Sequence, residues 1–272
     1  MAGERLRRQQ MSRWPYPRLL AHRGGGTLAP ENTLLACDVG FRYGYRAVEV
    51  DAVLSSDEVP VLLHDADLQR TTNGHGSVNS KTAAQLAALD AGSWFHPDYA
   101  HARIPTLEQA LQHCLERGIW LNVEIKPVPG QEARTGRLVA QTIARVWACL
   151  PATNLAAPLL SSFSPLALEA AREAAPQLAR GLLFSTIAPD WRNALQRLAC
   201  VSLHCDHRRL TSRLAQQIAA EGYGLLCYTV NDPRRARTIW SWGVDAICTD
   251  RIDRIGPADD PGPRQDARSQ AH

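Results

Sequence analysis

The sequence predicts a (β/α)8 barrel, in which eight parallel strands alternate with helices. Short, apolar, β-prone runs alternate along the chain with stretches that have the apolar period of an amphipathic helix. Repeated strand–helix alternation implies a parallel sheet, and eight such strands imply closure into a barrel. The length of 272 residues suits one barrel, which takes about 250 residues. An open, doubly wound sheet is the alternative.

The barrel strands are expected at the apolar runs 19–22, 47–54, 120–125, 159–163, 181–184, 201–204, 224–230 and 245–249. Helices are expected between them, at 32–43, 106–117, 135–148, 165–175, 190–198, 211–221 and 232–242. Asn32, Thr106 and Asp232 each precede a helical apolar period, so we expect them to be N-caps. Gly118 and Gly243 stand where helix C-termini need a residue that tolerates positive φ.

A further strand, 59–63, follows the strand at 47–54 after only residues 55–58. A parallel crossover needs roughly a dozen residues, so these two strands are expected to form an antiparallel hairpin. A turn centred near Ser56 and Asp57 would place His64 level with Glu49. The turn-rich stretch from about 65 to 103 fits neither period, and we expect it to be an insertion that caps one end of the barrel.

The predicted organisation is one domain over residues 18–256 with an extension at each end. Basic residues crowd the start of the chain, and residues 1–17 are expected to be a disordered arm. Residues 257–272 are rich in Pro, Asp, Gly and Gln and are expected to be a disordered tail.

Charge and composition argue against several kinds of partner. The net charge of +3 implies no basic face, so no nucleic-acid partner is expected. No run approaches the ~18 apolar residues of a membrane span, and no stable membrane association is expected. The start of the chain lacks the apolar segment of a secretory signal, and the seven cysteines contain no CxxC, so we expect reduced thiols in a cytoplasmic protein. The sequence does not determine the oligomeric state.

Acidic residues recur at the ends of two predicted strands. Glu49 and Asp51 point the same way because strand side chains alternate between faces, and Glu124 shares a face with Lys126 on the next barrel strand. Active sites of these barrels lie at the carboxyl ends of the strands. Three carboxylates that meet there repel one another unless a cation neutralises them, and oxygen ligands favour Mg²⁺ or Ca²⁺.

Two histidines lie at further strand ends. His22 ends the first strand and precedes Arg23 and three glycines, a combination that suits close approach to a phosphate. His64 ends the hairpin strand. Two imidazoles beside a cation site meet the needs of phosphodiester hydrolysis, in which one group takes a proton and another gives one.

Several segments follow one another along the chain in a characteristic order: HRGGGTLAPENT (22–33), EVD (49–51), PVLLHD (60–65), RTTNGHG (70–76), IPTLEQAL (104–111) and NVEIKP (122–127), and more loosely SSF, YTVND and TDR. As a set, from about His22 to Arg251, they resemble the glycerophosphodiester phosphodiesterase family. This resemblance implies a (β/α)8 barrel with a small inserted subdomain, and hydrolysis of glycerophosphodiesters to glycerol 3-phosphate and an alcohol. By position it implies metal ligands at Glu49, Asp51 and Glu124, an acid–base pair at His22 and His64, and phosphate contacts at Arg23 and Lys126.

The sequence gives fewer indications of which residues line the wall of the substrate pocket. Tyr228 stands where relatives often have Trp and is expected to shape this wall. Trp94 and Phe95 of the insertion are expected either to line the substrate mouth or to pack in the core.

Several aspects of function stay open in the sequence. Cleavage of lysophospholipids in the manner of a phospholipase D, or a non-catalytic binding protein on this fold, are alternatives to hydrolysis of small glycerophosphodiesters. The attacking group is either water or the glycerol 2-hydroxyl, which would give a cyclic phosphate. His64 is favoured as the acid, and the alcohol head group and preferred cation are undetermined.

Overall fold

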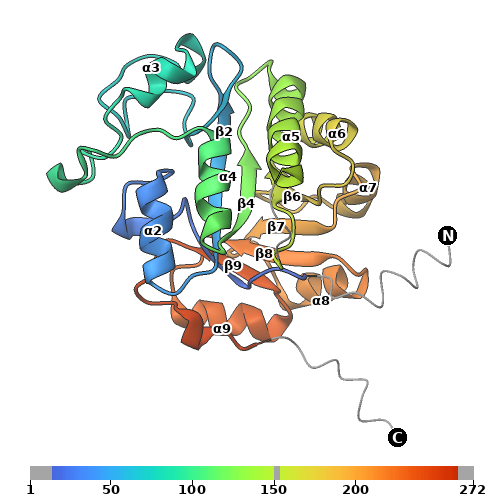
Figure 1. Ribbon diagram of the computed structural model, residues 1–272. Coiled ribbons are helices and arrows are strands. Elements are labelled where there is room, and N and C mark those ends of the chain that lie inside the picture. Colours follow the sequence, from blue (N-terminus) through green and yellow to red (C-terminus); the bar gives the residue numbers. More distant parts are fainter. Residues whose placement is uncertain (1–13, 150–153, 263–272) are drawn as a thin grey trace, which may run out of the picture.

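The computed structural model describes residues 14–149 and 154–262. Its strands are β1 Leu19–Ala21, β2 Ala47–Leu54, β3 Pro60–Leu62, β4 Trp120–Ile125, β5 Leu159–Ser162, β6 Arg180–Phe184, β7 Ser202–Asp206, β8 Gly224–Tyr228 and β9 Ala246–Thr249. All except β3 run parallel in one sheet, which closes because β1 pairs with both β9 and β2 (Figure 1). The predicted (β/α)8 barrel is therefore confirmed.

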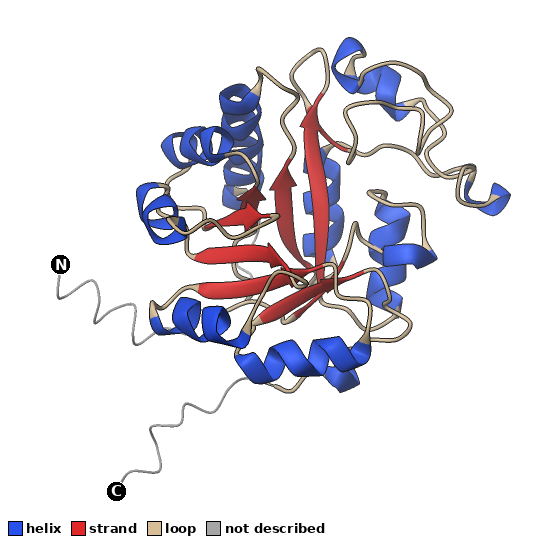
Figure 2. Ribbon diagram, turned by 180° about the vertical axis from the view of Figure 1, so that it is seen from behind, coloured by secondary structure: helices blue, strands red, loops and turns tan. Residues whose placement is uncertain are grey.

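Helices surround the barrel on its outer side (Figure 2). They are α2 Leu34–Arg42, α4 Leu107–Glu116, α5 Glu132–Ala148, α6 Pro165–Ala174, α7 Trp191–Arg197, α8 Ser212–Ala220 and α9 Pro233–Trp242. Each lies where the apolar period predicts a helix, with its ends shifted by a few residues. Thr106 and Gln109 form a capping box at the start of α4, and Asp232 caps α9, as expected. Gly243 ends α9 at φ 106°, a conformation that glycine adopts without strain.

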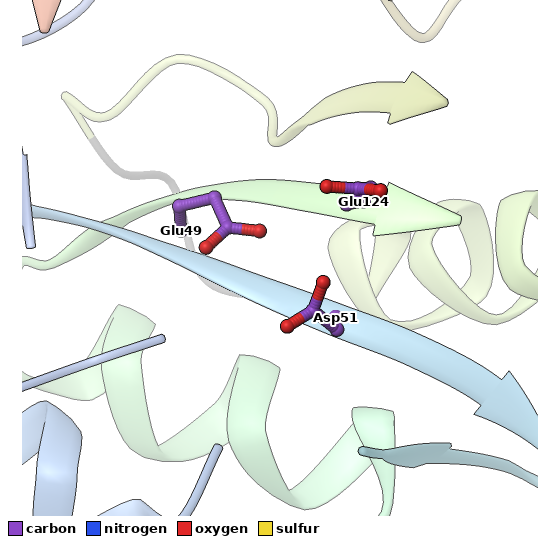
Figure 3. Close-up of side chains that lie close together, drawn as sticks. All are labelled: Glu49, Asp51 and Glu124. Carbon is purple, nitrogen blue, oxygen red and sulfur yellow. The ribbon is translucent and has the colours of Figure 1, made fainter. Parts of the chain in front are cut away.

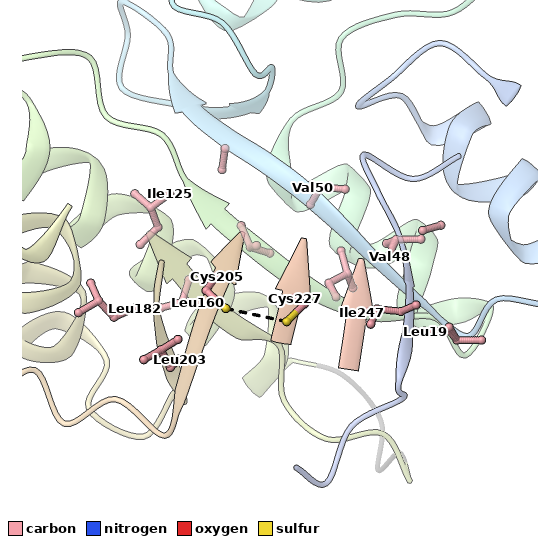
Figure 4. Packing of buried hydrophobic residues seen from close by; sticks show 14 of the residues in the cluster. Leu19, Val48, Val50, Ile125, Leu160, Leu182, Leu203, Cys205, Cys227 and Ile247 are labelled. Carbon is pink, nitrogen blue, oxygen red and sulfur yellow. Dashed lines mark hydrogen bonds between the residues drawn. The ribbon is translucent and has the colours of Figure 1, made fainter. Parts of the chain in front are cut away.

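Alternate strand residues face opposite sides of the sheet. Leu19, Ala21 and their counterparts on the other strands pack against the helices in the larger hydrophobic core, part of which Figure 4 shows. Leu20 belongs to a separate, smaller core, together with residues of five other strands: Ala47, Trp120, Leu159, Leu226, Ala246 and Cys248. These residues fill much of the barrel interior together with the buried pair of Ser202 and His204, while the charged side chains gather nearer its carboxyl end.

The segment just before β1 covers this smaller core. Trp14 is buried, and the ring of Tyr16 stacks on that of Trp120 with centroids 4.3 Å apart. The expected disordered arm is therefore wrong for residues 14–17, because two aromatic side chains among the basic residues have a buried surface to pack on. Residues 1–13 lie outside the described residues.

β2 and β3 form the expected antiparallel hairpin, but its register differs by one residue from the prediction. Leu54 pairs with Pro60, so His64 is level with Val50 and not with Glu49. The turn closes one position later than expected, because Ser55 already pairs with Val59 and Glu58 adopts φ 65°.

The insertion from 65 to 103 extends away from the barrel (Figure 1). It contains the short helix α3 Ala83–Ala87 and the 3-10 turns η2 Val78–Ser80 and η3 Pro97–Tyr99. Leu68, Val78 and Leu86 belong to its small hydrophobic core, which packs on Val53 and Val61 of the hairpin. The insertion is thus anchored on the β2–β3 hairpin, close to where His64 follows β3.

The chain after β9 returns to the start of the barrel. The 3-10 turn η4 Pro257–Asp259 precedes Asp260, which lies 3.5 Å from the guanidinium of Arg18, and Arg18 also donates to the carbonyl of Gly262. The expectation of a disordered tail is wrong for residues 257–262, because Arg18 binds them, and residues 263–272 lie outside the described part. Among the described residues, no helix has the length and apolarity needed to cross a membrane.

Candidate active site

Three carboxylates meet inside the barrel near its carboxyl end (Figure 3). Glu49 and Asp51 lie on β2, and Glu124 lies on the neighbouring β4 as the register partner of Asp51. One oxygen from each carboxylate lies within 4.8 Å of the oxygens from the other two, and all three residues are buried. The structure therefore brings together the three acids that strand alternation predicts on one face.

Burial and mutual repulsion disturb the protonation of these acids. Burial, followed by the charge of Asp51, raises the pKa of Glu49 to about 8 and that of Glu124 to about 7. Burial also opposes the ionisation of Asp51, but the charges of Lys126 and Arg23 outweigh it and lower the pKa of Asp51 overall. Glu49 Oε1 is buried without a hydrogen-bond partner among the described residues. These are the properties of a cluster that a cation would stabilise.

Asn32 fixes the orientation of Asp51. Its Nδ2 donates to Asp51 Oδ2 at 2.8 Å, and its Oδ1 accepts from the backbone N–H of Asp51 at 3.0 Å. The prediction that Asn32 caps α2 is wrong, because the cap is Thr33, whose hydroxyl accepts from the N–H of Ala36. Asn32 adopts φ 58°, which an asparagine tolerates better than most residues, and this turn directs its amide into the site.

His22 follows β1 and is held by a carboxylate on the last barrel strand. Its Nδ1 lies 2.5 Å from Asp250 Oδ1, and its Nε2 lies 3.8 Å from Glu49 Oε2. Asn231 Nδ2 donates to the other oxygen of Asp250 at 3.0 Å. Burial lowers the pKa of His22, but the hydrogen bond to Asp250 and the charge of Glu49 raise it overall.

His64 is held in a similar way, by the carboxylate of the residue that follows it. Its Nδ1 lies 2.6 Å from Asp65 Oδ1, and its Nε2 lies 3.1 Å from Lys126 Nζ. Burial lowers its pKa, and the charge of Asp51 does not fully offset this. The prediction that His64 stands beside Glu49 is wrong, since the hairpin register moves it toward Lys126 and His22 takes the place beside Glu49.

The two basic residues expected at the phosphate also border the acids. Lys126 Nζ lies 2.7 Å from Glu124 Oε1 and 3.6 Å from Asp51 Oδ1. The Nε atom of Arg23 lies 3.5 Å from Asp51 Oδ2, and its backbone N–H donates to Glu49 Oε2 at 3.2 Å. Both cations are thus placed at the edge of the carboxylate cluster, where they can meet an anionic ligand.

A second group of ion pairs supports Arg23 and His64. Glu31 accepts from Arg23 at 2.7 Å and from both terminal nitrogens of Arg70 at 2.7 and 2.8 Å. Arg70, which belongs to the insertion, also donates to Asp65 Oδ2. The insertion is therefore connected through Glu31 to one predicted phosphate contact and through Asp65 to one predicted catalytic histidine.

Two pockets open at the carboxyl end of the barrel. The first, of about 320 Å³, is called the insertion-side pocket and is lined by His22, Arg23, Gly26, Thr27, Ala29, Glu31, Trp94, Phe95 and Asp250. The second, of about 340 Å³, is called the β7–β8 pocket and is lined by Asp206, His207, Arg208, Tyr228 and Thr229. The structure thus places Trp94 and Phe95 at the pocket that contains His22, whereas Tyr228 lies in the other pocket.

Several residues of this arrangement were not assigned a role from the sequence: Glu31, Asp65, Arg70, Asn231 and Asp250. All of them lie within segments that resemble the phosphodiesterase family, so their presence there was the available signal. Asp65 follows His64 directly, but the contacts of Arg70 with Glu31 and of Asp250 with His22 span 39 and 228 positions, and no local pattern reveals such pairs.

Comparison with known proteins agrees with this geometry. The chain matches the glycerophosphoryl diester phosphodiesterase family over residues 22–254. It is 30% identical to a glycerophosphodiester phosphodiesterase of Caldanaerobacter subterraneus over 239 residues, which cover 85% of this chain and 93% of that protein. It is 32% identical to the Bacillus subtilis protein YhdW over 87% of this chain and 96% of that one.

A solved structure of an Oleispira antarctica phosphodiesterase in complex with the product sn-glycerol-3-phosphate has the same fold. Its TM-score is 0.80 at 36% identity, and the match covers 86% of this chain and 93% of the other. Because the family match spans most of the chain, including both histidines and all three acids, this chain belongs to the glycerophosphoryl diester phosphodiesterase family and is a phosphodiesterase.

Proposed function

We propose that this enzyme hydrolyses small glycerophosphodiesters to glycerol 3-phosphate and an alcohol, with a divalent cation and two histidines. The observation that supports this most is the cluster of three buried carboxylates, with His22 next to Glu49 and His64 next to Lys126, and with the Nδ1 of each histidine bound to a further carboxylate. The relatives are named for this activity, and the Oleispira antarctica phosphodiesterase binds sn-glycerol-3-phosphate as its product. A cytoplasmic location remains a prediction from the cysteine pattern.

Glu49, Asp51 and Glu124 would hold the cation. Their oxygens suit a hard ion such as Mg²⁺ or Ca²⁺, and the Oε1 of Glu49, which has no hydrogen-bond partner among the described residues, together with the raised pKa of Glu49 and Glu124 favours a cation bound at these acids. A bound dication would withdraw charge from the phosphoryl oxygens of the substrate.

Arg23 and Lys126 would bind the phosphate from two sides of the acids. Arg23 can offer two parallel N–H groups to phosphate oxygens, and Lys126 offers a compact ammonium. Lys126 contacts Glu124, and Arg23 lies close to Asp51. Both basic groups are therefore oriented before substrate arrives, which reduces the entropy lost in positioning the phosphate.

His22 would be the base and His64 the acid. The carboxylate of Asp250 and the charge of Glu49 raise the pKa of His22 and make its Nε2 a stronger proton acceptor. Burial lowers the pKa of His64, so its protonated form is the stronger acid, and Asp65 fixes the tautomer from Nδ1. His22 would deprotonate the attacking group, either water or the glycerol 2-hydroxyl, and His64 would protonate the departing alkoxide.

This assignment can be tested by changing the leaving group. We expect His64→Ala to lower kcat by about 10²–10⁴-fold on an alkyl diester but much less on a p-nitrophenyl diester, whose leaving group needs no proton. His22→Ala should lower kcat on both substrates, measured at saturating cation. Equal losses in the two variants on both substrates would remove the assignment, and a loss in His22→Ala confined to the alkyl diester would reverse it. If a chelator leaves turnover of glycerophosphocholine unchanged, the cation proposal fails.

A further inference from the structure

We propose that the β7–β8 pocket binds a positively charged ammonium group on the alcohol part of the substrate. The enzyme would then prefer diesters with cationic head groups to diesters of the same size with neutral ones. The inference rests on the proposed hydrolysis of glycerophosphodiesters and names the substrate class within it. Asp206 would be the counter-ion, and the ring of Tyr228 would form part of the wall.

The Tyr228 wall of the pocket is connected through one aromatic ring to the lysine proposed to hold the phosphate. Lys126 Nζ lies 5.8 Å from the centroid of the Phe163 ring, and this ring lies edge-to-face with that of Tyr228, with centroids 5.9 Å apart. Tyr228 on β8 is in turn the register partner of Asp206 on β7. Two aromatic rings thus lead from the phosphate position to the Asp206 carboxylate, and one arm of a bound diester can follow them.

Asp206 already binds a cationic group that is easily displaced. The Arg208 guanidinium contacts both oxygens of Asp206 at 2.6–3.1 Å, and it makes no other hydrogen bond or ion pair with the described residues. The side chain of Arg208 is 76% exposed, whereas that of Asp206 is 15% exposed. Because an exposed ion pair adds little stability, a ligand ammonium can replace this guanidinium at low cost. Aromatic faces such as that of Tyr228 attract such a cation further.

The insertion-side pocket offers no comparable carboxylate. Glu31 holds both Arg23 and Arg70, and Asp250 holds His22 and Asn231. Displacing these partners would disturb the residues proposed to act on the phosphate. Of the two pockets, only the β7–β8 pocket therefore has a carboxylate whose partner can leave without affecting the catalytic groups.

The remaining groups at the β7–β8 pocket do not oppose this role. Burial and the charge of Arg235 lower the pKa of His207, which favours its neutral form. The guanidinium of Arg235 lies 4.6 Å from the centroid of the Trp242 ring and donates a hydrogen bond to the backbone carbonyl of His207. Once Arg208 moves aside, Asp206 is the charged side chain that lines the pocket.

The test compares glycerophosphocholine with glycerophosphoglycerol, whose head group is neutral. We expect Asp206→Asn to lower kcat/KM for glycerophosphocholine by about tenfold and to change that for glycerophosphoglycerol by less than about twofold. Arg208→Ala should raise kcat/KM for glycerophosphocholine, because Asp206 becomes accessible. Tyr228→Leu should also lower kcat/KM for glycerophosphocholine selectively. Tyr228→Phe keeps the aromatic ring and should therefore retain the preference for glycerophosphocholine.

Asp253→Asn is a matched control. Asp253 forms an ion pair with Arg251, two residues away, just as Asp206 does with Arg208, but Asp253 lines neither pocket. It should leave both rates unchanged. Equal losses on the two diesters in Asp206→Asn, or a loss on glycerophosphocholine in Arg208→Ala, would overturn the inference while leaving the proposed hydrolysis intact. If the unmodified enzyme hydrolyses neither diester, the proposed function itself fails and the inference falls with it.

Discussion

Arg70 and Glu31 form a two-pronged ion pair that joins the insertion to the loop after β1. Both terminal nitrogens of Arg70 donate to Glu31, at 2.7 and 2.8 Å, while its Nε donates to Asp65. Glu31 also binds Arg23, and Asp65 also binds His64. A single guanidinium therefore positions the partners of one proposed phosphate contact and one proposed acid.

We predict that Arg70→Ala lowers kcat by about 10- to 100-fold, as loss of a residue that orients an active-site group often does. Arg70→Lys should recover little, because an ammonium cannot make the two parallel hydrogen bonds to Glu31. Arg145→Ala is the control, since Arg145 makes the same two-pronged pair with Glu108 on the outer helices at 3.0 and 2.8 Å. Similar thermal unfolding midpoints with unequal kcat would support positioning, whereas equal kcat in all variants would refute it.

The dyad of His22 and Asp250 gives a prediction about pH. Asp250 raises the pKa of His22, so Asp250→Asn should lower that pKa. If His22 is the base, the rising limb of kcat/KM against pH then moves to lower pH, while the maximal rate falls by about 10-fold or more because the imidazole is less well oriented. The measurement is the pH profile on a p-nitrophenyl diester. An unshifted limb with a lower plateau would mean that Asp250 only supports the local structure.

The parts of this site that the sequence predicts are those that follow from periodicity. Glu49, Asp51 and Glu124 converge because alternation along a strand and parallel pairing with the next strand determine where they point. The hairpin register was missed by one residue because it depends on the backbone conformation of Glu58 at φ 65°, which no pattern in the sequence marks.

The sequence also does not predict which distant segments contact one another. Asp250 reaches His22 across 228 residues, and Arg70 reaches Glu31 across 39, so only the closed barrel brings them together. The start of the chain shows the opposite error. Its basic residues suggested an arm in solution, but Trp14 and Tyr16 supply the apolar surface that seals the barrel.

The acid cluster predicts that cation affinity rises with pH. Protons on Glu49, with a pKa of about 8, and Glu124, with a pKa of about 7, compete with the cation, so affinity should increase between about pH 6 and 9 and binding should release protons. Calorimetry in two buffers of different ionisation enthalpy measures this release. An affinity that does not change over this range would contradict the raised pKa values.

The same groups determine how the cation-free enzyme responds to pH. A carboxyl group whose pKa is higher in the folded than in the unfolded state binds more protons when folded, so stability falls as pH rises from about 4.5 to about 8. We expect the thermal midpoint in chelator to decrease over this interval, and Glu49→Gln to reduce the decrease. A midpoint in chelator that stays constant from pH 5 to 8 would show that burial of Glu49 has no such cost.

Asn32 provides the last prediction, because its backbone and its side chain can be tested separately. Asn32→Gly keeps a residue that tolerates φ 58° but removes both hydrogen bonds to Asp51. The Asp51 carboxylate then loses its fixed orientation, and cation affinity should fall by about 10- to 100-fold. Asn32→Asp also tolerates the backbone conformation, but it places a fourth acid against Asp51 and should lower the thermal midpoint in chelator more than Asn32→Gly does. Affinities within twofold of the unmodified enzyme in Asn32→Gly would show that the barrel alone orients Asp51.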